Sequence, residues 1–143
     1  MRRTRLAVVA VAGLTIAVAG CGSTGGSGGA NVPGTIKATL TDFKIELSGT
    51  TAPAGTVTFN ADDKGPSIHE LVVFKTDLAP NALPTDGNGN VDESKLTKVG
   101  ELPNIGLSDS PTLKVDLAVG KYVVLCNLPA HYKAGMYAAL TVT

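Results

Sequence analysis

The sequence lacks the features that mark several large classes of protein. Its 143 residues contain no cluster of lysine and arginine, no internal repeat and no convincing long amphipathic helix. Without a basic cluster a nucleic-acid partner is not expected, and without amphipathic helices a helical fold is not expected. Tryptophan is absent, and histidine and cysteine occur only twice each. The few side chains with versatile chemistry therefore carry most of the information about function.

The first 20 residues are expected to direct export rather than to join the fold. Three arginines, at positions 2, 3 and 5, precede an uninterrupted run of apolar and small residues over 6–20. This run is typical of a secretory signal and is too short to span a bilayer as a helix. It ends Val-Ala-Gly-Cys21, which resembles the lipobox of bacterial lipoproteins, where the cysteine is acylated. We therefore predict an extracytoplasmic lipoprotein anchored to the membrane through Cys21. The alternative is an ordinary secretory signal that happens to precede a cysteine.

Residues 21–34 are a predicted flexible tether, and residues 35–143 a single folded domain. Six of the 13 residues in 22–34 are glycine, so the segment should behave as a coil spanning about 20 Å. The remaining length suits one domain with one core, and we expect a monomer. Without the signal arginines, nine lysines oppose twelve acidic residues, a net charge of −3. That charge does not favour nucleic acid or an anionic membrane surface.

The domain is predicted to be all-β. Apolar and polar residues alternate in short segments between Gly and Pro turns, which is typical of a β-sandwich. The expected strands cover 36–40, 43–47, 56–60, 69–76, 113–117, 122–126 and 136–142. The alternation changes phase after the first segment, which predicts a bulge near Thr41 and Asp42. Between 78 and 111 the pattern weakens into a long loop excursion with one expected strand, over 98–102. Loops of this length are uncommon unless they are functional or partly ordered.

Four side chains with metal-binding atoms fall where one ion could collect them. Cys126 ends a strand, Met136 begins the next, His131 lies in the loop between them, and His69 begins a strand far upstream. Each has an ordinary explanation as a core cysteine, a core methionine, a surface histidine or a strand-end histidine. Those explanations leave the coincidence of all four unaccounted for. Two histidines, one cysteine and one weakly bound methionine form the ligand set of a blue-copper electron-transfer site, which predicts one Cu(I)/Cu(II) ion.

The cysteine count agrees with this hypothesis. Two cysteines in an exported protein would ordinarily suggest a disulfide. If Cys21 carries lipid, however, Cys126 has no partner, and a free thiol in an oxidising compartment is a hazard unless its sulfur is occupied. A bound metal would occupy it.

Residues 35–143 resemble the cupredoxins, the blue-copper family of plastocyanin, azurin and rusticyanin. The resemblance rests on His69-Glu-Leu-Val-Val, on Val-Val-Leu-Cys126-Asn-Leu-Pro-Ala-His131 and on Ala-Gly-Met136 before a final strand. It implies a Greek-key β-sandwich of seven to eight strands with copper at one pole. It also implies that Met136 is the axial ligand and that the other three are equatorial.

The same resemblance indicates which neighbours of the ligands matter. The imidazole edge of His131 is the expected exit for electrons. The residues expected to ring it are Pro129, Ala130 and Tyr132. Many relatives have Asn or Ser directly after the first histidine, where it ties the two ligand loops together, whereas this chain has Glu70. Asn127 could still supply a loop-stabilising amide, but neighbours of this kind tune the reduction potential, so the potential cannot be transferred from relatives.

The histidine count limits what the site can do. Copper nitrite reductases and multicopper oxidases need further histidine-rich centres, and both histidines are already used. A four-coordinate site closed by protein also leaves no open position for substrate. A hydrolase dyad of Cys126 and His131 is the rival enzyme interpretation, but it leaves Met136 and His69 unexplained. We therefore predict a carrier and not an enzyme.

The predicted function is single-electron transfer between redox proteins of the membrane or cell envelope. The alternative is a copper-binding protein for delivery, storage or tolerance. A third interpretation is a metal-free scaffold that serves adhesion or assembly. Reversible redox cycling of a coloured site, as opposed to ready transfer of Cu(I) to an acceptor, distinguishes the first from the second.

Two groups of acidic residues have simpler interpretations. The segment Asp86-Gly-Asn-Gly-Asn-Val-Asp resembles the middle of a calcium-binding loop, but Pro84 and Lys95 occupy the positions of its two strongest ligands. A tight Asx and Gly turn is therefore the better interpretation. The acidic pairs 62–63 and 92–93 are expected to be solvated, or to guide a basic redox partner.

Overall fold

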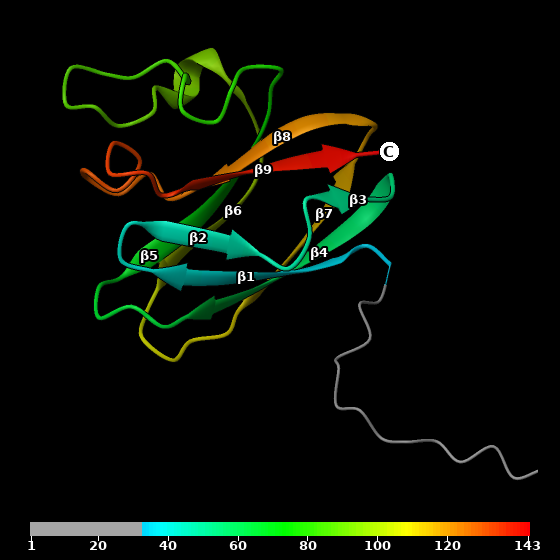
Figure 1. Ribbon diagram of the computed structural model, residues 1–143, viewed down its shortest axis with the longest axis horizontal. Coiled ribbons are helices and arrows are strands. Elements are labelled where there is room, and N and C mark those ends of the chain that lie inside the picture. The colour runs from blue at the N-terminus through cyan, green and yellow to red at the C-terminus, as the bar shows by residue number, and fades with distance from the viewer. Residues whose placement is uncertain (1–32) are drawn as a thin grey trace, which may run out of the picture.

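The computed structural model describes residues 33–143 as a sandwich of two β-sheets (Figure 1). The elements are β1 (Thr35–Thr41), β2 (Lys44–Leu47), β3 (Thr51–Ala52), β4 (Gly55–Asp63), β5 (His69–Lys75), a 3-10 turn η1 (Glu93–Lys95), β6 (Thr97–Ile105), β7 (Thr112–Leu117), β8 (Gly120–Leu125) and β9 (Tyr137–Val142). One sheet has the order β2-β1-β4-β7 and the other β3-β9-β8-β5-β6. The predicted all-β sandwich is confirmed, and the ninth strand is the two-residue β3, which is too short to leave a sequence pattern.

The main core fills the space between the sheets because alternate residues of each strand point inward. In β1 these are Ile36, Ala38 and Leu40, and in β4 the inward set includes Val57 and Phe59, all nearly or fully buried. Burying a side chain such as Phe59 stabilises the fold by roughly 1.5–3 kcal/mol. This core fixes the relative position of the two sheets.

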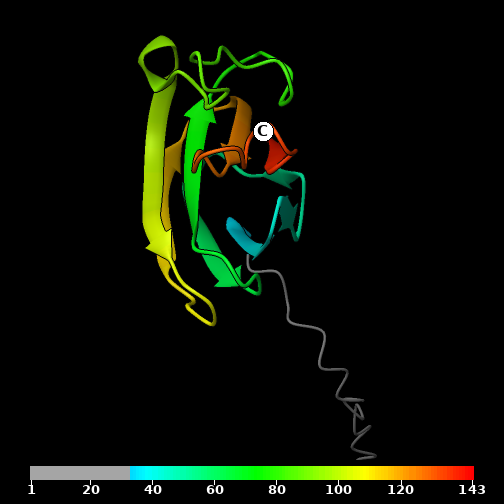
Figure 2. The same cartoon turned by 90° about the vertical axis from the view of Figure 1, so that its left-hand side faces the viewer.

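Strands β5 and β8 are buried on both faces, because part of the long excursion covers their outer side. We call residues 78–96 the strap. A second apolar cluster joins the strap to this outer side of the sheet. It comprises Val72, Phe74, Leu83, Val91, Val123, Leu125 and Tyr132. In Figure 1 the strap lies beside the loop 126–136, and Figure 2 looks onto that end of the molecule. The excursion therefore packs on the sheet as a layer of its own.

The rest of the excursion is more regular than its sequence indicates. The expected strand over 98–102 is the centre of the nine-residue β6, which pairs with β5.

Within the strap, the predicted Asx and Gly turn is confirmed, because Asp86 Oδ1 accepts hydrogen bonds from the backbone N–H groups of Asn88 at 2.8 Å and Asn90 at 3.0 Å. Those bonds occupy a carboxylate oxygen that a calcium site would need.

The predicted bulge near Thr41 and Asp42 is wrong, because the chain reverses there in a tight turn. β1 ends at Thr41, β2 begins at Lys44, and these two residues pair directly. The two-residue connection contains Phe43 at φ 64°, and such turns usually carry Gly or Asn at a positive φ. With a phenylalanine in that place, the turn had no recognisable sequence pattern.

The chain enters and leaves the domain at one pole, and the predicted ligands lie at the other (Figure 1). At the entry pole, Gly34 O accepts from Thr58 N at 2.7 Å and Thr143 N donates to Ala52 O at 3.0 Å. Gly34, expected at the end of the tether, is thus already part of the fold. The signal peptide over 1–20, Cys21 and most of the tether lie outside the described residues. Within 33–143, no helix is long and apolar enough to cross a bilayer.

Candidate metal centre

Three neighbouring strands bring the predicted ligands to the same pole. β8 lies between β9 and β5 and is antiparallel to both. Cys126 follows the last residue of β8, Met136 precedes the first residue of β9, and His69 opens β5. Because adjacent antiparallel strands begin where their neighbours end, these positions fall at one edge of the sheet. His131 comes from the turn-rich loop between β8 and β9.

Backbone hydrogen bonds connect the three predicted ligands of this segment, Cys126, His131 and Met136, to one another. Cys126 N donates to Met136 O at 3.1 Å, and Met136 N donates to His131 O at 3.0 Å. A further bond from His131 N to Leu128 O, at 3.0 Å, closes the first turn of the loop. The spacing of the cysteine, histidine and methionine is therefore set by the backbone of the loop as well as by their side chains.

The side chains of Cys126 and His69 both lie close to that of His131. Cys126 Sγ lies 3.3 Å from His131 Nδ1, and the ring centroids of the two histidines are 5.3 Å apart. A metal with a sulfur ligand at 2.3 Å and nitrogen ligands near 2.0 Å would set these separations at roughly 3.5 and 5 Å. Among residues 33–143, no three His, Cys, Asp or Glu side chains are already gathered as a chelating group. The observed separations fit a shared ion with small side-chain adjustments.

Burial controls the protonation of two of these side chains. Burial raises the pKa of the Cys126 thiol to about 11, with smaller opposing contributions from the backbone N–H groups of Leu128 and Glu70. Burial, together with the proximity of His69, lowers the pKa of His131, although Asp42 opposes this shift. At neutral pH the free protein thus holds a protonated thiol beside a neutral imidazole, and a metal would have to displace the thiol proton.

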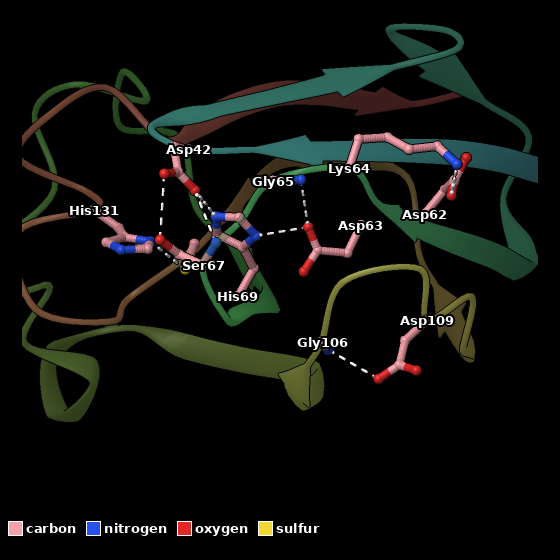
Figure 3. A network of polar contacts seen from close by, with 11 residues as sticks. Asp42, Asp62, Asp63, Lys64, Gly65, Ser67, His69, Gly106, Asp109 and His131 are labelled. Carbon is pink, nitrogen blue, oxygen red and sulfur yellow. Dashed lines mark hydrogen bonds and ion pairs between the residues drawn. The ribbon is translucent and has the colours of Figure 1, made fainter.

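His69 is fully buried within a network of carboxylates (Figure 3). Its Nδ1 lies 3.0 Å from Oδ1 of Asp63, which is also fully buried. Its Nε2 lies 3.4 Å from Oδ1 of Asp42 but has no hydrogen-bond partner. A buried imidazole nitrogen without a partner is costly unless something binds it, so the His69 ring has a free nitrogen atom in the interior. The expectation that Asp63 is solvated is wrong.

Glu70 and Asn127 join the two segments that carry the ligands. Asn127 N donates to Glu70 Oε1 at 2.8 Å, which links the residue after the cysteine to the residue after the first histidine. Burial raises the pKa of Glu70, and this N–H opposes that shift. The glutamate thus makes the cross-link expected from Asn or Ser at its position.

Asn127 and Tyr132 fasten the ligand loop to the strap. The Asn127 amide accepts from Val91 N at 2.6 Å and donates to Val91 O at 3.0 Å. Tyr132 Oη accepts from Leu83 N and donates to Pro80 O, each at 3.0 Å. Tyr132 is only 6% exposed, so it does not lie on the rim where the sequence analysis placed it. Its role is to connect the loop to the strap.

The exposed rim of the site has a different composition from the one expected. Pro129 and Ala130 are exposed and His131 is half-buried, as expected for a surface beside the ligand. The third member is Phe43, which is 50% exposed and meets the His131 ring edge-on, with centroids 5.5 Å apart. Phe43 comes from the β1–β2 turn, so the other sheet contributes to this surface.

Comparison with solved structures identifies the fold, whereas comparison with family models and with curated proteins finds no match. No family model and no curated protein matches the chain. Auracyanin from the photosynthetic bacterium Roseiflexus castenholzii matches with a TM-score of 0.58 at 25% identity, over 77% of this chain and 97% of that one. Rusticyanin from Thiobacillus ferrooxidans matches with a TM-score of 0.57 at 14% identity, over 78% and 79%. An azurin from Methylomonas sp. strain J gives 0.54 at 21% identity, over 76% and 97%. The domain has a cupredoxin fold.

Within this domain of cupredoxin fold, three residues near the candidate site were missed as neighbours of the predicted ligands. Asp42 and Phe43 were missed because their turn has no typical turn sequence. Asp63 could have been found, because it lies in phase with Val57, Phe59 and Ala61 on the inward face of β4. Because Asp63 is charged and directly follows another aspartate, the sequence analysis treated both residues as solvated and did not recognise this alternation.

Proposed function

We propose that this cupredoxin domain holds one copper ion and carries single electrons. The proposed ligands are His69, Cys126, His131 and Met136. The observation that carries the proposal is the contact of a buried thiol with an imidazole nitrogen where three strand ends meet, beside a second buried imidazole. A thiolate, two imidazoles and a thioether suit both Cu(I) and Cu(II), so when bound the ion can accept and release one electron.

The protein's role is to hold these donor atoms in fixed positions and to keep water away from them. Cys126, His69 and Met136 are fully buried, and the loop that carries two of them is fixed by its own backbone, by Glu70 and by the strap. The Cys126 thiol releases its proton when the thiolate binds, so loading should liberate about one proton per ion. A site that changes little between oxidation states transfers electrons with little reorganisation.

His131 is the proposed route for electrons to leave. It is the one ligand that is not fully buried, and exposed apolar side chains surround it. Such a surface allows a redox partner to approach the imidazole edge with little charge to desolvate. The partners we propose are redox proteins of the membrane or cell envelope, with no role for nucleic acid, and the domain is proposed to act as a monomer.

The hydrolase interpretation is poorly supported, although Cys126 and His131 are in contact. A catalytic thiol needs a lowered pKa and access to substrate. Here burial raises the pKa of the thiol to about 11, and the side chain has no exposed surface. We therefore propose a carrier without catalytic activity. Copper delivery is also less well supported, because three of the four proposed ligands are closed to an acceptor.

The decisive experiment is to add Cu(II) to the purified metal-free protein and record its visible spectrum. We expect an intense thiolate-to-copper band that is bleached by ascorbate and restored by ferricyanide over repeated cycles. Cys126→Ser should abolish the band, whereas Cys21→Ser, the same change at the other cysteine, should keep it. A colourless protein that binds copper no better than Cys126→Ser would refute the proposal. Loss of the ion to a Cu(I) chelator at the first reduction would favour copper delivery instead.

The proposed location is the outer face of a membrane, with a lipid on Cys21. The support is the lipobox-like sequence, and mass spectrometry of the N-terminus from the native host tests it. A diacylated or triacylated Cys21 is the expected result. An unmodified N-terminus at another residue would contradict the anchor without affecting the copper proposal.

A further inference from the structure

We propose that the strap clamps the loop 126–136 in its metal-binding arrangement, and that Asn127 is the positioning residue through which the strap acts on Cys126. This inference rests on the proposed copper site. The strap supplies none of the proposed ligands, and it lies beside the loop that carries them (Figure 1). Any effect of the strap on the ion must therefore pass through the residues that the strap contacts.

Asn127 bonds the strap with both ends of its side-chain amide. Its Oδ1 accepts from Val91 N at 2.6 Å, and its Nδ2 donates to Val91 O and to Glu93 Oε1, each at 3.0 Å. The two bonds to Val91 use both backbone groups of that residue, as a neighbouring β-strand would. Because the carbonyl oxygen and both N–H groups of the amide are occupied, the side chain is held in one orientation.

The part of the strap that receives Asn127 is itself folded and packed. Thr85 and Val91 form a β-bridge, and Asp92 N donates to Pro84 O at 2.8 Å. The Val91 side chain is buried and belongs to the same apolar cluster as Leu125. The strap can therefore act as a firm support for the loop.

The strap meets the chain on the side opposite the Cys126 thiol. Successive side chains of extended backbone point to opposite faces. Leu125 packs in the cluster that joins the strap to the sheet and Asn127 bonds the strap, whereas Cys126 belongs to the main core. Both neighbours of the cysteine are thus tied to the strap, and Cys126 Sγ lies on the other side, 3.3 Å from His131 Nδ1.

The same arrangement recurs at the next proposed ligand of the loop. Tyr132 directly follows His131, and its hydroxyl bonds Leu83 N and Pro80 O of the strap. Without the strap, the loop would sample arrangements in which the ligands no longer meet. The apparent affinity of a site falls with the fraction of molecules in which that site is assembled. The strap should therefore raise the affinity for copper without touching the ion.

The test compares Asn127→Ala with Asn88→Ala in the full-length protein. Asn88 lies in the exposed turn of the strap, and its hydrogen bond to Asp86 comes from its backbone, which alanine keeps. Residues that orient a metal ligand typically contribute 10- to 100-fold to affinity, so Asn127→Ala should weaken Cu(I) binding about tenfold or more. Competition with the Cu(I) chelator bathocuproine disulfonate measures this. Asn88→Ala should bind Cu(I) as the parent protein does.

Thermal midpoints with and without copper separate positioning from a merely structural role. Asn127→Ala should lower the midpoint of the copper-bound protein more than that of the copper-free protein, because weaker binding adds less stability. Equal losses in the two forms, with unchanged copper affinity, would show that Asn127 is structural only. Equal losses of affinity in Asn127→Ala and Asn88→Ala would show that the bonds of Asn127 are not responsible. Either result would overturn the inference.

A measurement on the unmodified protein covers the case in which Asn127→Ala does not fold. Coupling is reciprocal, so a strap that strengthens copper binding is held more firmly by the same factor when copper is bound. Hydrogen exchange followed by NMR should therefore give the Val91 amide a protection factor about tenfold or more higher in the diamagnetic Cu(I) form than in the copper-free protein. The Lys37 amide is the control, because it also donates to a side-chain oxygen, that of Ser48, but lies in the other sheet.

The outcomes of the exchange experiment are distinct. A larger gain at Val91 than at Lys37 is the expected result. No gain at Val91, or equal gains at the two amides, would overturn the inference. A parent protein that forms no coloured copper complex would instead refute the proposed function, so the two failures are distinguishable.

Discussion

His69 and His131 are proposed to bind the same ion, yet the protein surrounds them in opposite ways. His69 opens a strand that is buried on both faces, has no exposed surface, and meets two carboxylates. His131 lies in a loop, is half-buried, and meets an exposed aromatic ring. The first environment immobilises a ligand, whereas the second leaves an edge available to a partner. It follows that retention of the ion, which we assign mainly to His69, and exchange of electrons, which we assign to His131, need not depend on the same side chain.

Removing each histidine tests this division most severely. His69→Gly and His131→Gly should both lose the copper band, and each should weaken copper binding by more than the roughly 10- to 100-fold that is typical of losing only a neighbour of a ligand. Added imidazole should restore the band in His131→Gly, because that cavity opens to solvent, but not in His69→Gly. Visible spectra over an imidazole titration measure this. Equal rescue of both variants would remove the contrast between the two sites.

The strap should support the His131 loop much more than it supports His69. Tyr132→Phe removes the hydroxyl that bonds Leu83 N and Pro80 O, leaving a buried N–H without its partner. We expect a loss of about 1–3 kcal/mol in the free energy of unfolding, measured by denaturant titration. Tyr137→Phe is the matched control, since the Tyr137 ring packs on Tyr132 but its hydroxyl makes no such bonds. Similar losses in both variants would mean that packing, and not the hydroxyl, joins loop and strap.

Phe43 should affect one histidine and leave the other unchanged. Phe43→Ala removes the edge-on contact with His131, which is worth roughly 0.5–1.5 kcal/mol in a buried pair and less at a half-exposed one. We expect NMR signals of the His131 ring to shift and those of the His69 ring to stay. Equal shifts of both rings would indicate that the β1–β2 turn supports the whole pole.

Acid should loosen the strap at its C-terminal end, where Glu93 lies, with the smallest effect. Glu93 accepts from Asn127 Nδ2 at 3.0 Å and pairs with Lys98 at 2.9 Å. Burial tends to raise the pKa of Glu93, but Lys98 and Asn127 outweigh it, so the pKa is lowered from 4.5. A lowered pKa means that this stabilisation is present above pH 4.5 and is lost as the pH falls through the folded-state value. The protection factor of the Val91 amide, which is its exchange rate relative to the intrinsic rate at the same pH, should therefore fall on acidification in the parent protein and change less in Glu93→Gln.

The fold could be predicted from the sequence, because it depends on regular patterns. Alternation located the long strands, and the ends of those strands bring His69, Cys126 and Met136 to one pole, where their binding of a metal stays a prediction. The short strand β3 and the β1–β2 turn were not predicted. A strand of two residues is too short to show alternation, and Phe43 is an unusual residue for its backbone conformation. The neighbours of the ligands were predicted less well. Tyr132 was assigned to the surface and Asp63 to solvent, because residue type alone does not reveal which way a loop side chain turns or which carboxylate is enclosed.

The separation of the chain ends from the candidate site has a practical consequence. Residues 33 and 143 lie together at one pole, and the seven residues of β1 span about 23 Å toward the other. A linker, a surface or a second protein attached at either end would therefore leave the His131 edge pointing outward. The domain could be attached to an electrode through its termini and still face the solution with the surface through which we propose that electrons pass.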